Sequence, residues 1–178
     1  GSFEENFNEL NILPMSISYE YESCDIRKAR ELLISRKQKY VKKKHEDTHS
    51  IISGISQWKG GINLSIDKPI TPEEVHEASI LDKNDRYQAL RKTLDERIIC
   101  NYKLWKTNFI AYDMLEGKGK YSDRYSKENV EEFEGYMAHK LGKVERCLNH
   151  DELKQIFLDI YANPVRAKEE LLNGKVDV

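Results

Sequence analysis

The sequence predicts a mainly α-helical protein, a single irregular bundle of about five to seven helices with a small two-stranded β element. Three observations predict it. Apolar residues recur at helical spacing over most of the chain, helix-start signals precede several of these runs, and only two short segments alternate apolar with polar residues. With 178 residues, 39% of them hydrophobic and 34% charged, the chain can form one domain with a thin core and a charged surface.

The N-terminus is expected to carry a short arm, residues 1–14, ahead of a single helical domain, residues 15–178. Gly1 and Ser2 resemble the remnant of a cleaved tag. The arm has three apolar side chains on one helical face: Phe3, Phe7 and Leu10. That face either folds back on its own domain or docks on a partner, and the sequence also allows it to be a fused peptide segment.

Two segments have the period-2 pattern of half-buried strands. Met15, Ile17, Tyr19 and Tyr21 alternate with polar residues, and a shorter alternation runs from Ile62 to Ile66. Because a lone strand leaves backbone groups unpaired, we expect the two segments to form a small ribbon.

Helical patterns fill most of the remaining chain. Asp25 is expected to cap a long helix that ends before Gly60, with a break near residues 45–50 or at Gly54 as an alternative. Thr71 and Pro72 begin a short helix that runs to about Leu81.

A central core helix is expected from Asn84 or Asp85 to Gly117, with Trp105 on its apolar stripe. Ser126 should cap a helix with a seam-like apolar face, and Asp151 should open the next. Three further residues predict a separate last helix: Asn163 and Pro164 at its start, and Gly174 at its end.

The charge distribution is strongly uneven. Nine basic residues between positions 27 and 44 stand against one acid, a net charge of +8. Because the whole chain carries −2, the rest carries −10. We expect this segment to form a basic helix that is either a solvated face, a dock for an acidic protein surface, or a nucleic-acid contact. Its basic residues are Arg27, Lys28, Arg30, Arg36, Lys37, Lys39, Lys42, Lys43 and Lys44.

Catalytic signatures are weak. The string from His45 to His49 matches the zinc-binding HExxH pattern, but three lysines precede it and no third ligand is evident, so a zinc-dependent hydrolase is the least favoured reading. Trp58 is either a core residue or a candidate binding anchor beside the basic helix.

The membrane and the exterior of the cell are disfavoured. No stretch approaches the roughly 18 apolar residues that a membrane crossing needs, and the first residues lack a signal-peptide pattern. The three cysteines are widely spaced, which favours reduced thiols. We therefore expect a nuclear or cytoplasmic protein that needs no cofactor or metal and does not contact a membrane.

The expected function is a non-catalytic interaction or scaffold subunit of an intracellular assembly. It would dock on an acidic or helical protein surface through the basic helix and the arm. Nucleic-acid binding through residues 27–44 is the alternative. The sequence identifies neither the partner, the organism, the biological process nor the oligomeric state.

Overall fold

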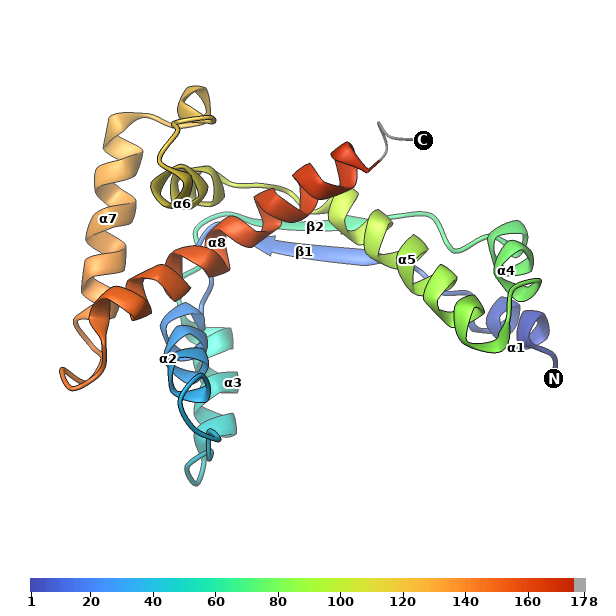
Figure 1. The fold of residues 1–178 in the computed structure, drawn as a ribbon, viewed down its shortest axis with the longest axis horizontal. Coiled ribbons are helices and arrows are strands. Elements are labelled where there is room, and N and C mark those ends of the chain that lie inside the picture. The colour runs from blue at the N-terminus through green and yellow to red at the C-terminus, as the bar shows by residue number, and fades with distance from the viewer. Residues whose placement is uncertain (175–178) are drawn as a thin grey trace. The chain divides into compact units, whose positions relative to one another are not determined.

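The computed structural model describes residues 1–174 and is mainly helical, as expected, with one two-stranded antiparallel sheet (Figure 1). The described chain contains eight α-helices, more than predicted, and none is long and apolar enough to span a membrane. In chain order the elements are α1 (Phe3–Leu10), β1 (Met15–Tyr19), α2 (Asp25–Ser35), α3 (Glu46–Ser56), β2 (Ile62–Ile66), α4 (Pro72–Ser79), α5 (Lys83–Asn101), α6 (Lys106–Glu116), the 3-10 turn η1 (Ser122–Arg124), α7 (Lys127–Leu141) and α8 (His150–Asn173).

The chain groups into two compact units. Among the described residues, unit 1 combines residues 1–18, 63–103 and 167–174, and unit 2 combines residues 19–62 and 104–166. The predicted arm is therefore part of unit 1.

Two predicted helix starts are confirmed by their capping hydrogen bonds. The Thr71 hydroxyl accepts from the Glu74 N–H, and the Ser126 hydroxyl accepts from the Asn129 N–H. In each case the third residue of the helix reaches back to the capping residue, which closes a capping box.

The predicted basic helix is wrong beyond Ser35. Residues 36–45 form an irregular segment, and α3 starts only after His45, whose φ of 66° lies in the left-handed region. Six basic side chains fall within this segment, and at helical spacing they would place like charges one turn apart. An open segment lets them separate.

Two other predicted boundaries are also wrong. The expected core helix is interrupted at residues 102–105, and the first part, α5, buries only Leu90. Trp105 is half-buried and precedes α6, with its ring against Gly61.

At the C-terminal end, Pro164 lies inside a continuous α8 instead of starting a new helix. A proline removes one backbone hydrogen bond, and α8 tolerates that loss because its buried face spans both sides of Pro164.

The sheet presents its apolar side to solvent, the reverse of the usual arrangement. Backbone hydrogen bonds from Asp67 to Pro14 and from Glu20 to Gly61 fix one register. In that register Met15 lies opposite Ile66 and Ile17 lies opposite Leu64, all on one face. Ser16 and Ser18 on the other face are buried, 5% and 1% exposed, whereas the four aliphatic residues are about half exposed or more.

The core of unit 1 is small, and α1 contributes to it. Val75 and Leu90 are buried, and Phe3 and Phe7 pack against them. The two phenylalanine rings also contact the ring of Tyr87, with centroid distances of 5.4 and 6.1 Å. The apolar face of α1 is thus covered by its own chain at Phe3 and Phe7, while Leu10 remains 66% exposed.

The core of unit 2 surrounds a buried carboxylate, that of Asp25, which is 0% exposed. The hydroxyl groups of Tyr136 and Tyr161 donate to its Oδ2 atom, at 2.7 and 2.8 Å. The ammonium group of Lys140 lies 3.5 Å from its Oδ1 atom and donates to the Gln57 side chain. Burial raises the pKa of both tyrosines, so they remain hydrogen-bond donors.

This network joins α2, α7 and α8 at one point. Asp25 was expected to cap α2, but Cys24 occupies the capping position and Asp25 is the first helical residue. Its carboxylate still accepts from the Ile26 N–H and lies at the positive end of the helix dipole. A buried carboxylate with four donors is well stabilised, whereas the same carboxylate without its cation is costly.

We predict that Lys140→Met destabilises unit 2 by about 3 kcal/mol, because it leaves the Asp25 charge buried without a cation. Chemical unfolding followed by circular dichroism measures the change. Lys143→Met, which removes an exposed cation from the same turn, should have little effect, and Asp25→Asn combined with Lys140→Met should recover part of the loss. Equal stability of the Lys140→Met variant and the wild type would contradict the assigned role of the network.

Candidate functional site

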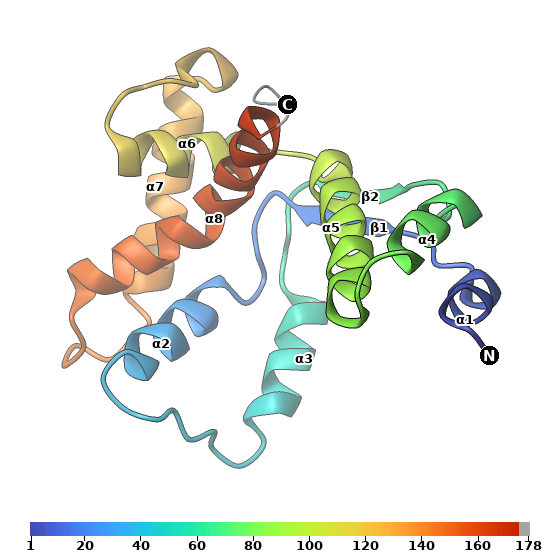
Figure 2. The same ribbon diagram turned by 45° about the vertical axis from the view of Figure 1, so that its right-hand side comes forward.

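A basic cleft in unit 2 gathers part of the predicted basic segment. Its volume is about 370 Å³, and most of its lining residues come from α2, the segment 36–45 and the start of α3. Figure 2 shows how the chain runs from α2 through this segment to α3. The turn between α7 and α8 closes it. The lining residues are Arg27, Arg30, Tyr40, Lys43, Lys44, Glu46, His49 and Glu145.

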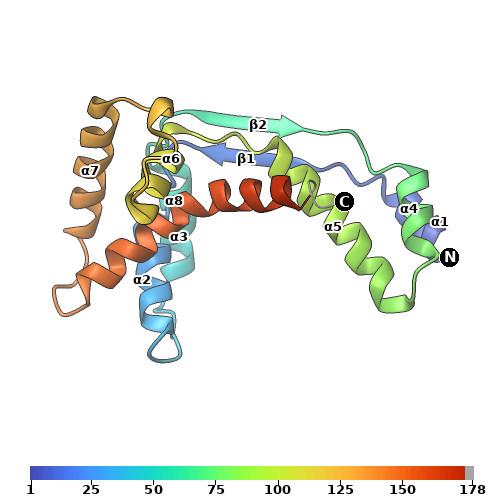
Figure 3. The same ribbon diagram turned by 45° about the horizontal axis from the view of Figure 1, so that its top comes forward.

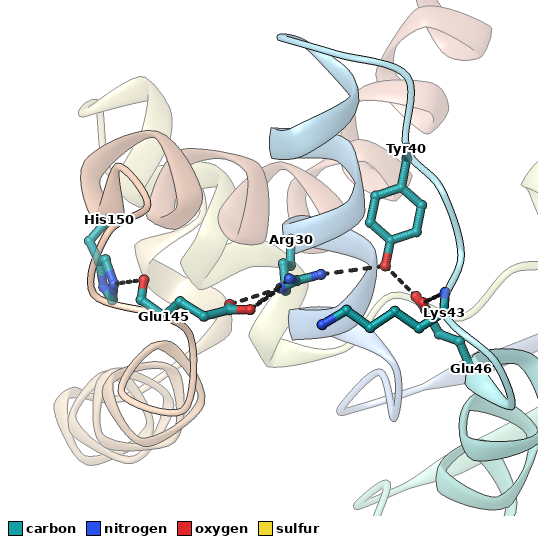
Figure 4. Close-up of polar contacts among 6 residues, drawn as sticks. All are labelled: Arg30, Tyr40, Lys43, Glu46, Glu145 and His150. Atoms are coloured by element: carbon teal, nitrogen blue, oxygen red, sulfur yellow. Dashed lines mark hydrogen bonds and ion pairs between the residues drawn. The ribbon is translucent and has the colours of Figure 1, made fainter.

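The floor of the cleft is a two-pronged ion pair between Arg30 and Glu145 (Figure 4). Arg30 Nε donates to Glu145 Oε2 at 2.8 Å, and Arg30 Nη2 donates to Glu145 Oε1 at 2.6 Å. Arg30 lowers the pKa of Glu145 to about 2. This geometry ties α2 to the turn before α8, where the His150 ring also contacts the Glu145 carbonyl oxygen at 3.2 Å.

Tyr40 continues the network from α2 to α3. Arg30 Nη1 donates to the Tyr40 hydroxyl at 3.4 Å, and that hydroxyl donates to Glu46. The other Glu46 oxygen accepts the Lys43 N–H at 2.8 Å, so the first acid of α3 anchors the segment that precedes it. The cleft wall is therefore fixed although residues 36–45 have no regular secondary structure.

Three other cations that line the cleft have no acidic partner within residues 1–174. The side chains of Arg27, Lys43 and Lys44 form no hydrogen bond or ion pair with any part of the chain that the structure describes. A second hollow of about 340 Å³ shares Arg27, Arg30 and Glu145 with the cleft and adds Lys140 and Lys143. Six cations thus surround the two hollows against two lining carboxylates, Glu46 and Glu145.

An apolar surface begins where the cleft ends. No residue of α3 is buried, and its outward face carries Ile51, Ile52 and Ile55, which are 64%, 55% and 77% exposed. At 100° per residue, Ile52 lies next to His49, which lines the cleft. Trp58 follows the helix, 64% exposed, and stacks at 4.7 Å on the ring of buried Tyr21. We call Ile51, Ile52, Ile55 and Trp58 the α3 apolar face.

The nine predicted basic residues divide into two groups. Arg27, Arg30, Lys43 and Lys44 line the cleft. The others lie outside it: Lys28, Lys37 and Lys42 pair with acidic side chains of this chain, and Arg36 and Lys39 are exposed.

The zinc hypothesis gains no geometric support. His45 precedes α3 in a left-handed conformation, so the two histidines do not lie on one continuous helix. Among residues 1–174, no group of three or more His, Cys, Asp or Glu side chains could hold a metal ion.

Several lining residues were missed by sequence reasoning. Glu145, Lys140 and Lys143 lie about a hundred positions from the basic segment, and nothing in their local sequence distinguishes them from surface charges. Tyr40 also lines the cleft, from a segment that was expected to be helical.

A larger hollow lies in unit 1, and most of its charged residues pair with one another. It measures about 550 Å³ between α5 and the end of α8. Its cations are already paired, Arg91 with Asp95 and Lys92 with Glu96.

We predict that the Arg30–Glu145 pair stabilises the folded protein only above acidic pH. The folded-state pKa of Glu145, about 2, lies below the usual 4.5, so the contribution is complete above pH 4.5 and is lost as the pH falls toward 2. Because Glu145 is half exposed, the effect should not exceed about 1 kcal/mol. Glu145→Gln should therefore lose less stability than the wild type between pH 4.5 and 2, measured by urea unfolding. Glu131→Gln, on an exposed face of α7, is the control and should follow the wild type. If Glu145→Gln lost as much stability as the wild type between pH 4.5 and 2, the role assigned to the Arg30–Glu145 pair would be refuted.

The sequence matches no family model, no curated protein and no solved structure. Function is therefore inferred from the cleft and its surroundings.

Proposed function

We propose that this protein is a non-catalytic interaction module that docks an acidic, partly apolar protein segment on the basic cleft and the α3 apolar face. The observation that carries the proposal is the position of α3. It buries none of its own residues, yet unpartnered cations border its first turn and three isoleucines occupy its outward face. A helix of this length is marginal without packing, so a partner on this face would stabilise it.

The chemistry of the two surfaces defines the partner. Arg27, Lys43 and Lys44 favour carboxylates or other anions, whereas Ile51, Ile55 and Trp58 favour aliphatic or aromatic side chains. An amphipathic helix with acids along one side of its apolar stripe satisfies both requirements. The preformed Arg30–Glu145 floor reduces the ordering that such docking requires.

A protein partner is favoured over nucleic acid for two reasons. The isoleucines of the α3 apolar face offer a protein partner aliphatic contacts that a nucleic acid has no side chains to match. The sequence pI of about 6.3 is also below that of a domain built for duplex binding. Nucleic-acid binding is the second outcome of the experiment below.

The probe is a fluorescent amphipathic helical peptide of Glu, Leu and Ala, compared with single-stranded and duplex DNA. We expect the peptide to bind, with affinity falling as salt rises, and Arg27→Glu combined with Lys44→Glu to weaken binding about tenfold or more. The matched control, Arg36→Glu with Lys39→Glu, changes the charge equally outside the cleft and should have a much smaller effect. Fluorescence anisotropy measures all three proteins.

Two results would refute the proposal. One is tighter binding of DNA than of the peptide, which would favour the nucleic-acid alternative. The other is an equal loss of affinity in both double variants, which would show that the peptide responds to the net charge of the protein and not to the cleft. Burial of Trp58 provides an independent readout: peptide binding should shift its emission to the blue in the wild type, and Trp58→Phe, which retains Trp105, should lose that shift.

A further inference from the structure

The exposed side of the sheet is a second apolar surface, separate from the cleft. Met15 and Ile17 of β1 and Leu64 and Ile66 of β2 are 52%, 49%, 56% and 61% exposed. The register places them as two directly opposed pairs on one face, and we call these four residues the ribbon face. Figure 3 shows the two strands side by side.

The ribbon face is not an ordinary scatter of surface aliphatics. The same strands bury Ser16 and Ser18, so the polar side is inside and the apolar side is in water. A register shifted by one residue would have buried the aliphatic residues instead. Two strands alone are marginally stable, which makes a second layer on the ribbon face energetically favourable.

The area fits a small specific interface. Four aliphatic residues, each about half exposed, present on the order of 400 Å² of apolar surface, which is within the range of the largest apolar patches on monomers. If that surface makes up about 60% of one side of an interface, two such sides bury on the order of 1,300 Å² in total. Specific interfaces start at about 1,200 Å².

The charges near the ribbon face indicate which partner could cover it. Neither β1 nor β2 contains a charged residue, so the four aliphatic side chains themselves bring no like charges into the contact; the ammonium group of Lys59, 5.9 Å from the centroid of the Tyr19 ring, lies beyond them at the end of β1. The α3 apolar face lacks this property because cations flank it, and two copies of it would repel. A two-fold symmetric contact requires a self-complementary patch, and a purely aliphatic patch meets that requirement.

We propose that the ribbon face is a homodimer interface, in which the sheets of two copies pack face to face through Met15, Ile17, Leu64 and Ile66. Packed sheets lie about 10 Å apart, so the aliphatic side chains of the two ribbons fill the space between them. The modest area makes the dimer a weak one that dissociates on dilution.

Sedimentation equilibrium over a range of protein concentrations tests the proposal. We expect the wild type to approach twice its chain mass of 20.9 kDa at high concentration and to dissociate on dilution. Ile17→Lys and, separately, Leu64→Lys should remain monomeric, because each buries a charge in the contact. Ile80→Lys is the matched control: Ile80 is 72% exposed at the end of α4, outside the ribbon face, and its variant should dimerise like the wild type.

Circular dichroism should show that both strand variants stay folded, since both side chains already face solvent. A wild type that is monomeric at every concentration would overturn the proposal and leave the ribbon face to a different partner. A dimer that survives both lysine variants would overturn it as well, by placing the contact elsewhere. The acidic peptide should bind Ile17→Lys as tightly as the wild type, so the outcome does not depend on the proposed function of the cleft.

Discussion

Unit 2 depends on one buried charge, the carboxylate of Asp25. The carboxylate belongs to α2, and helices α7 and α8 reach it with hydroxyl and ammonium groups. Because these interactions are directional, they fix the positions of the three helices more accurately than apolar contacts could. Because α2 is held there, Arg30 one turn and a half later meets Glu145, and Tyr40 meets Arg30. The geometry of the cleft thus follows from the network beneath it, and Lys140 connects that network to the second hollow beside the cleft.

At Tyr21 the apolar side chains of this segment stop facing solvent and begin to face the core of unit 2. It was predicted to share a face with Met15 and Ile17, but it is 1% exposed. The Tyr21 N–H donates to the Lys59 carbonyl, one residue out of step with the ladder that ends at Glu20 and Gly61. Gly60, with φ of 63°, supplies the turn that permits this step. The side chain therefore points into the core of unit 2 although the alternation of the sequence is unbroken.

The exposed surfaces of the protein differ in what they can contact. The basic cleft and the α3 apolar face combine cations with exposed isoleucines, which suits the acidic, partly apolar partner that we propose, whereas the four residues of the ribbon face are uncharged, which suits the self-contact that we propose. The apolar face of the arm was expected either to fold back on its own domain or to dock on a partner; Phe3 and Phe7 pack within unit 1, whereas Leu10 is exposed. Our proposal therefore places docking at the cleft.

The sequence by itself determined what depends on neighbouring residues. It specified the helical class, the two strands, the caps at Thr71 and Ser126, and the excess of positive charge between residues 27 and 44. Tertiary structure decided what depends on distant residues: which side of the ribbon is buried, where the basic segment stops being helical, that Glu145 lines the cleft, and that Lys143 lines the hollow beside it. A period of two shows that a strand has two unlike faces, but only the packing of the rest of the chain determines which face meets water. Likewise, local charge predicts attraction, whereas pairing with Glu145 or Asp25 determines which cations remain available.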